Sequence, residues 1–246
     1  MALDRREDAF GQLLLDQLAG RGGQAILERD DGRAQPALPA AVFFGAFDKW
    51  PPEEQQVFEG VQGRVLDVGC GAGRHSLEAQ RRGCEVVAID ISPGAVEVAR
   101  RRGVIDVRLL PLADVDHTLG VFDTLLMMCG NFGLFGTEAE ARRLLRTLHD
   151  ISSPDGRIVF DSVDPSDDAH DLSYQARNRF LGRRPGQVTI RLRYRDCANP
   201  WFDLLNLSPS ELEELIEGTG WGLAELVPSA PPEYFGVLEK AGSRSR

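Results

Sequence analysis

The glycine-rich stretch VLDVGCGAGR, at positions 65–74, constrains the fold of this chain more than any other feature. An apolar run typical of a short buried strand leads into Gly69, Gly71 and Gly73, and a helical segment follows directly. Glycine loses more backbone entropy on folding than any other residue, so three of them indicate a loop that needs a bare backbone. Such a loop, placed between a strand and a helix N-terminus, presents N–H groups to the polar end of a ligand.

The same alternation of strand and helix continues to about residue 163. Apolar runs predict strands at 85–89, 106–110, 122–128 and 156–163, and helical periodicity predicts helices at 74–83, 93–103 and 137–151. Strands separated by helices of this length require crossover connections. We therefore expect an α/β fold with a doubly wound, mainly parallel sheet covered by helices on both faces.

Less regular segments flank this region. Residues 1–62 contain an amphipathic helix at about 6–20, a Gly- and Pro-bearing loop to about 39, and an aromatic-rich stretch, which together predict an N-terminal helical lid. The pattern of residues 163–207 predicts an inserted cap with a half-exposed strand at 187–196. The pattern of residues 221–240 predicts a closing hairpin. The expected domains are thus the lid, 1–62, and a ligand-binding domain, 63–246, that includes the inserted cap.

Composition excludes several functional classes. The 246-residue chain carries a formal charge of −10, which argues against a nucleic-acid partner. Its cysteines form no C-x-x-C pair and its histidines no H-E-x-x-H motif, so we expect no metal; the Asp- and His-bearing segment 164–171 is more typical of a solvated loop. The first residues lack the apolar core of a signal peptide, and no apolar run has the ~20 residues of a membrane span. These features predict a cytoplasmic protein without membrane association.

An acidic residue narrows the choice of ligand. Asp90 ends the next apolar strand, about 20 residues after the first glycine, where a carboxylate can accept both hydroxyls of a ribose. The dinucleotide pattern G-x-G-x-x-G requires glycine at 74, which is arginine, and GRHS lacks the Lys-Ser/Thr pair of a P-loop. A purely structural turn would not explain Asp67 and Asp90 beside the glycines. The expected ligand therefore contains a ribose but is neither NAD nor a nucleoside triphosphate.

The stretch 65–100, VLDVGCGAGRHSLEAQRRGCEVVAIDISPGAVEVAR, resembles the N-terminal half of class I S-adenosylmethionine-dependent methyltransferases. The resemblance implies a Rossmann-like sheet of strand order 3-2-1-4-5-7-6 with an antiparallel last hairpin, and S-adenosylmethionine as cofactor. In that family the acid before the glycines orders the loop and the methionine amino group, and the glycines form the floor of the site. The acid after the second strand binds the ribose. The cofactor-binding residues implied here are Asp67, Gly69, Cys70, Gly71, Gly73, Asp90, Ile91, Asp114, Val115 and Cys129.

One position departs from the family pattern. An aspartate that binds the adenine amino group usually follows the third strand, but Pro111 and Leu112 stand there in this chain. Asp114 is the nearest substitute and Asp116 the next, and each also suits a solvated turn. The adenine-binding acid therefore stays open between these two, with Asp114 preferred.

The methyl acceptor is the least constrained part of the prediction. The family's fourth strand ends near the transferred methyl, which makes Asn131 the candidate catalytic residue, although an Asn in a turn is equally consistent. The exocyclic-amine motif Asn-Pro-Pro-aromatic is absent, because Gly133 and Leu134 follow Phe132. Acceptor-site candidates are Phe44, Trp50, Asn131, Tyr194 and Trp201, with core packing as the alternative for the aromatic ones.

The resemblance implies methyl transfer to an O, N or C nucleophile of a small molecule. One alternative is an RNA or protein methyltransferase that uses the arginines at 191, 193 and 195; another is a non-catalytic S-adenosylmethionine-binding module. Displacement at a sulfonium needs alignment, desolvation and, for some acceptors, a base. The sequence by itself names neither that base nor the acceptor, and it does not fix the oligomeric state.

Overall fold

A computed structural model describes residues 3–167 and 171–242, so residues 168–170 of the segment 164–171 lie outside the described residues. The chain divides into two compact units. The first comprises Met1–Trp50, Gln62–Val115 and Thr189–Phe202. The second comprises Pro51–Val61, Asp116–Val188 and Asp203–Arg246.

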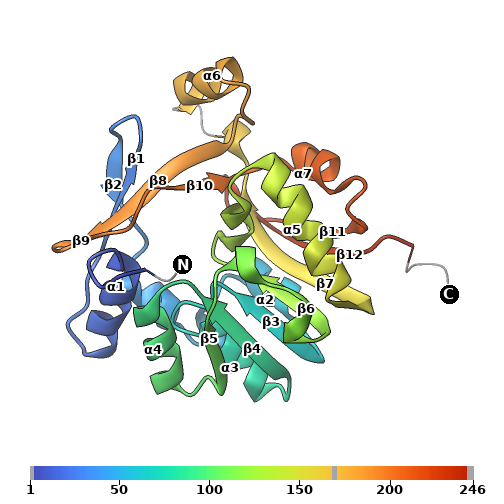
Figure 1. The fold of residues 1–246 in the computed structure, drawn as a ribbon, viewed down its shortest axis with the longest axis horizontal. Helices are drawn as coiled ribbons and strands as arrows, with labels where there is room; N and C mark the ends of the chain where they lie inside the picture. The colour runs from blue at the N-terminus through green and yellow to red at the C-terminus, as the bar shows by residue number, and fades with distance from the viewer. Residues whose placement is uncertain (1–2, 168–170, 243–246) are drawn as a thin grey trace. The chain divides into compact units, whose positions relative to one another are not determined.

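The strand order of the seven-stranded sheet is β11-β12-β7-β6-β3-β4-β5 (Figure 1). Its strands are β3 (Arg64–Val68), β4 (Glu85–Asp90), β5 (Asp106–Leu109), β6 (Phe122–Met127), β7 (Ser152–Val163), β11 (Trp221–Pro228) and β12 (Glu233–Lys240). The pairs β3–β4, β4–β5 and β6–β7 are parallel, whereas β12 is antiparallel to both β7 and β11. Counted along the chain this is the order 3-2-1-4-5-7-6 with an antiparallel last hairpin, which confirms the predicted fold class.

The α-helices of the first unit are α1 (Ala9–Leu18), α3 (Arg74–Arg81) and α4 (Pro93–Arg102). Ser92 caps α4 by accepting the Ala95 N–H, and Gly103 ends it in the left-handed conformation. The buried Asp8 carboxylate caps α1 through the Gly11 N–H and also accepts the Gly94 N–H of α4 at 2.8 Å. Helix α1 therefore docks directly on the start of α4 (Figure 1).

Arginine side chains fix the aromatic segment of the first unit. This segment forms two 3-10 helices, η1 (Ala40–Phe44) and η2 (Phe47–Lys49). Arg102 donates to the Ala72 carbonyl at 2.6 Å and lies over the Phe44 ring, while Arg74 donates to the Val42 carbonyl and lies over the Trp50 ring. Guanidinium groups stack on aromatic faces while their N–H groups remain available to carbonyls, so a few arginines hold the whole segment.

A second, smaller sheet has the order β10-β8-β1-β2, with β9 beside β8. Its strands are β1 (Ile26–Arg29), β2 (Ala34–Pro36), β8 (Gln187–Tyr194), β9 (Cys197–Ala198) and β10 (Phe202–Leu205). Strand β1 pairs antiparallel with β8, Ile26 opposite Arg193. The stretch predicted as a loop before residue 39 thus forms two strands. The N-terminal segment therefore contains strands as well as helices, because β8 supplies an edge with which β1 pairs.

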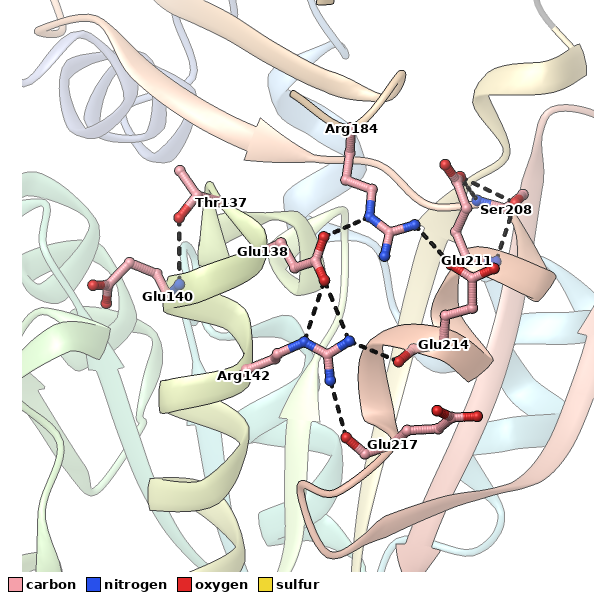
Figure 2. A network of polar contacts seen from close by, with 9 residues as sticks. All are labelled: Thr137, Glu138, Glu140, Arg142, Arg184, Ser208, Glu211, Glu214 and Glu217. Carbon is pink, nitrogen blue, oxygen red and sulfur yellow. Dashed lines mark hydrogen bonds and ion pairs between the residues drawn. The ribbon is translucent and has the colours of Figure 1, made fainter. Parts of the chain in front are cut away.

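In the second unit the helices are α2 (Pro52–Phe58), α5 (Glu138–Asp150), α6 (Leu172–Phe180) and α7 (Pro209–Ile216). An arginine network joins α5, α7 and the turn before β8 (Figure 2). Arg184 donates to Glu138 at 2.7 Å and to Glu214 at 2.9 Å, and Arg142 donates to the carbonyls of Glu214 and Glu217 at the end of α7. These bonds tie the inserted segment to the helices of its own unit.

Short 3-10 helices complete the described chain: η3 (Leu112–Asp114), η4 (His117–Leu119), η5 (Asn131–Phe135) and η6 (Pro165–Asp167). Within the described ranges, no helix is both long enough and apolar enough to cross a bilayer.

Candidate cofactor and active site

The glycine loop has a backbone that only glycine adopts freely. Gly69, Gly71 and Gly73 have φ values of 69°, 54° and 76°. A Cβ on Gly73 would also lie 2.6 Å from the Val104 side chain, closer than real Cβ contacts. The loop is fixed against the neighbouring strand, because the Gly69 and Cys70 N–H groups both donate to the Ile89 carbonyl. The glycines are thus required by backbone conformation and close packing.

The predicted ribose-binding acid lies directly against this loop. Asp90 Oδ2 accepts the Gly71 N–H at 2.9 Å, and Oδ1 accepts the Ser92 N–H at 2.8 Å. Burial raises the pKa of Asp90 to about 6, opposed by these two hydrogen bonds and reinforced by the nearby charges of Asp8 and Asp67. Its carboxylate is therefore oriented by the backbone before any ligand binds.

Asp67 and Cys70 are interior parts of the same region. Asp67 is 1% exposed and accepts a hydrogen bond from the Ser76 hydroxyl in α3. Burial raises its pKa, and His75 and Ser76 act in the opposite direction. Burial likewise raises the pKa of the Cys70 thiol well above its usual range, so this cysteine packs as a neutral side chain. Asp67 therefore joins the strand before the loop to the helix after it.

Of the predicted cofactor-binding residues, Ile91 directly follows β4, and Asp114 and Val115 lie beyond β5. Ile91, directly after Asp90, is 41% exposed and offers an apolar surface, whereas Val115 is buried. Asp114 is exposed in η3. The Asp116 side chain caps η4 by accepting the Thr118 N–H and hydroxyl. Since Asp116 is occupied by this cap, Asp114 remains the prediction for the adenine-binding acid.

In the second unit, the turn after β6 donates a hydrogen bond to Asp161 of β7, an acid that no sequence motif indicated. Cys129 and Gly130 both have positive φ, 62° and 79°, and Asn131 begins η5. The Gly130 N–H donates to Asp161 Oδ2 at 2.7 Å, at the carboxyl end of the parallel part of β7. Burial raises the pKa of Asp161 to about 7. A single Asp in an apolar strand has no spacing signal, so its position next to Cys129 emerged only from the fold.

This donor set fits S-adenosylmethionine. In the first unit, the oriented Asp90 carboxylate matches a ribose diol, and the exposed Ile91 beside it matches an adenine ring. The glycine loop lies next to the same carboxylate, to which it donates the Gly71 N–H.

Comparison with known proteins identifies the family. The Methyltransferase domain family matches residues 65–156. The solved structure of an S-adenosylmethionine-dependent methyltransferase from Bacteroides fragilis, in complex with S-adenosyl-L-homocysteine, is similar over 98% of both chains, with a TM-score of 0.82 and 27% sequence identity. Residues 65–156 thus form a methyltransferase domain, and the fold of the chain is that of the class I S-adenosylmethionine-dependent methyltransferases. The predicted cofactor, S-adenosylmethionine, is thereby confirmed.

Curated methyltransferases are similar over a shorter stretch. The magnesium-protoporphyrin O-methyltransferase of Rhodobacter capsulatus is 39% identical over 71 residues, which cover 26% of this chain and 31% of that protein. The ubiquinone biosynthesis O-methyltransferase of Xanthomonas oryzae is 41% identical over 71 residues, 26% of this chain and 30% of that protein. The chain thus matches these two relatives over about a third of their length.

The aromatic acceptor-site candidates of this methyltransferase all make contacts within the first unit. Trp50 is 4% exposed, donates to the Gly45 carbonyl and packs edge-on against His75. Tyr194 is also buried, and its hydroxyl is hydrogen-bonded to Asp16 and to the Gly22 carbonyl. Trp201 is 44% exposed beneath the Arg191 guanidinium. Trp50 and Tyr194 therefore support the fold, and a role for any of them in acceptor binding stays a prediction.

The arginine-rich face of β8 is neutralised by acidic residues of the first unit. Arg191 and Arg193 both contact Glu28 at 2.7 Å, and Arg195 contacts the buried Asp16 at 2.7 Å. Both acids have lowered pKa values, to which these arginines contribute. The basic stripe seen in the sequence is thus an internally paired surface.

Proposed function

We propose that this methyltransferase transfers the methyl group of S-adenosylmethionine to an O, N or C nucleophile of a small molecule. The observation that carries the proposal is the Asp90 carboxylate held against the glycine loop by the Gly71 and Ser92 N–H groups. Bound S-adenosylmethionine supplies an electrophilic methyl carbon on a good leaving group. Asp90 would hold the ribose, the glycine loop and Asp67 the methionine end, and Ile91 and Asp114 the adenine.

Two observations favour a small acceptor over RNA. The arginines of β8 are paired with Glu28 and Asp16, and the net charge of −10 repels a phosphate backbone. The two curated relatives have names that specify a magnesium-protoporphyrin and ubiquinone biosynthesis. Both are small-molecule O-methyltransferases by name, which supports the same class of acceptor here.

Two measurements test this function. Titration calorimetry with S-adenosylmethionine tests the cofactor site, and transfer of tritium from methyl-labelled S-adenosylmethionine to a small-molecule library, to tRNA and to a cell protein extract tests the acceptor class. We expect saturable cofactor binding and label in small molecules alone. Label in tRNA, with binding that weakens as salt is raised, supports the RNA alternative, and cofactor binding without any transfer supports a non-catalytic module.

A further inference from the structure

The carboxylate of Asp161 occupies a position in the sheet where ligands bind. Strands β6 and β7 are parallel, and their pairing ends with Met127 opposite Phe160; β7 continues to Val163 beside β12, with Asp161 opposite Phe235. In open α/β sheets, ligands bind outside the carboxyl ends of the parallel strands. Asp161 follows Phe160 directly, and on the neighbouring strand Met128 and Cys129 follow Met127.

The surrounding backbone is built to hold this carboxylate. Oδ2 accepts the Gly130 N–H at 2.7 Å, and the Cys129 N–H is directed at the same carboxylate. Cys129 has a φ of 62°, an uncommon conformation for a residue with a side chain and one that recurs at functional sites. Two successive left-handed residues aim their N–H groups at a single anion. The turn after β6 thus maintains the orientation of Asp161.

The second carboxylate oxygen, Oδ1, has a different hydrogen-bond environment from Oδ2. Asp161 Oδ1 is buried, and it accepts no hydrogen bond from the described residues. Buried polar atoms are nearly always hydrogen-bonded in folded proteins, so an exception calls for a functional explanation. Its companion Oδ2 is already bound to the backbone, which leaves Oδ1 as the atom that can receive a proton.

The charges around Asp161 adapt it to proton transfer. Burial is the largest cause of its raised pKa of about 7, and Glu54 of α2 and Glu233 of β12 raise it further, while the N–H groups of Gly130 and Cys129 lower it. A carboxylate that titrates near neutral pH is suited to take a proton from a reacting group. The same acidic neighbours disfavour an anionic acceptor such as a carboxylate or a phosphate.

We propose that Asp161 Oδ1 is the general base of the reaction and that the acceptor reacts through an N–H or O–H group. The acceptor gives its proton to Oδ1, its electron pair forms the new bond to the methyl carbon, and the carbon–sulfur bond breaks with its pair remaining on S-adenosylhomocysteine. This assignment rests on the proposed function. It names the proton-bearing class of acceptor and the group that activates it.

The first test uses an acceptor found in the tritium-transfer screen. Asp161→Asn keeps the shape of the side chain and an oxygen that can accept the Gly130 N–H, so we expect normal folding, unchanged S-adenosylmethionine affinity and a kcat lower by about 10²–10⁴. The wild-type kcat should rise with pH through about 7 and lose this rise in the variant. Asp155→Asn, an exposed acid on the same strand, is the matched control and should change neither value.

The second test needs no acceptor. Sinefungin is an S-adenosylmethionine analogue with a protonated amine in place of the methyl sulfonium, so it probes for a carboxylate beside the transferred methyl. We expect its affinity for the wild-type protein to increase as pH rises from 6 to 8, and to be about tenfold weaker in Asp161→Asn at pH 8. S-adenosylhomocysteine, which lacks that amine, should bind wild type and variant equally.

Equal sinefungin affinity in the wild type and Asp161→Asn, or an undiminished kcat in that variant, would overturn the assignment. Labelling confined to carboxylate or phosphate acceptors would do the same. If the wild type labels no acceptor at all, the proposed function fails instead, and the sinefungin comparison still decides the role of Asp161.

Discussion

At the scale of single residues, the cofactor site depends on a carboxylate that the backbone orients. Asp90 is 7% exposed, and both of its oxygens are hydrogen-bonded to N–H groups of the chain. Its carboxylate is therefore already desolvated in the folded protein before a ligand binds. Asp90→Ala should remove a charge-assisted bond to the ribose worth ~1.5–3 kcal/mol and weaken S-adenosylmethionine binding roughly ten- to a hundredfold. Calorimetry measures this loss. Glu85→Ala, at the exposed start of the same strand, serves as the control, and an unchanged affinity for Asp90→Ala would refute the ribose assignment.

The raised pKa of Asp90 gives cofactor binding a pH dependence. The carboxylate accepts the ribose hydroxyls best when ionised, and its pKa of about 6 means that it takes up a proton as the pH falls through 6. We therefore expect S-adenosylmethionine affinity to be steady between pH 7 and 8 and to fall progressively from pH 7 to 5. Asp90→Asn should bind weakly with a flat profile over that range. A wild-type profile equally flat would show that Asp90 does not titrate there.

At the scale of elements, α1 and α4 form one structural piece with the glycine loop. A Cβ on Gly94 of α4 would lie 2.7 Å from the Gly11 Cα of α1, so the two helices meet backbone to backbone. Asp8 joins them through Ser92, at 2.6 Å, and Ser92 in turn donates its N–H to Asp90. The N-terminal helix thus supports the cofactor-binding acid through a single intermediate residue.

Loss of the Asp8 hydrogen bonds that join α1 to α4 should lower the free energy of unfolding. Asp8→Ala leaves buried donors of Gly11, Ser92 and Gly94 without their acceptor, so we expect the free energy of unfolding to fall by about 2–4 kcal/mol. Urea denaturation measures the change. Asp48→Ala, on the exposed surface of η2, is the control and should stay within about 0.5 kcal/mol of the wild type. A similarly small effect for Asp8→Ala would mean that α1 docks through its apolar residues alone.

At the scale of the whole molecule, cofactor binding should raise the free energy of unfolding and the Tm of the protein. A ligand that binds only the native state adds ~2.7 kcal/mol at a hundredfold excess over its Kd, which corresponds to roughly 5–11 °C in Tm for a chain of this size. We expect such a shift with S-adenosylmethionine and with S-adenosylhomocysteine, and none with NAD. Differential scanning fluorimetry makes the comparison. A Tm shift with NAD would contradict the prediction that Arg74, in place of the third glycine of the dinucleotide pattern, excludes NAD.

The sequence predicted the central sheet because its signals are local. Glycines with positive φ, apolar strands and capped helices each lie within a few residues of one another, and the acid at 90 has a fixed spacing from Gly69. Strands β1 and β2 escaped prediction because their residues are all partly or fully exposed and lack alternation. The pairing partner of β1 lies more than 150 residues further along the chain. Glu28, which neutralises the arginines of β8, and Asp161 were missed for the same reason: their environments exist only after distant segments meet.

The pairing of β1 with β8 limits how this enzyme can be re-engineered. Residues 26–29 and 190–193 share one ladder of backbone hydrogen bonds and an ion-pair cluster, although one strand belongs to the N-terminal segment and the other to the insertion. A chimera that imports only the insertion of another methyltransferase leaves β1 with a foreign edge and Glu28 without its arginines. An exchange of either segment therefore has to include the other, because each supplies the pairing edge and the charges that the other needs.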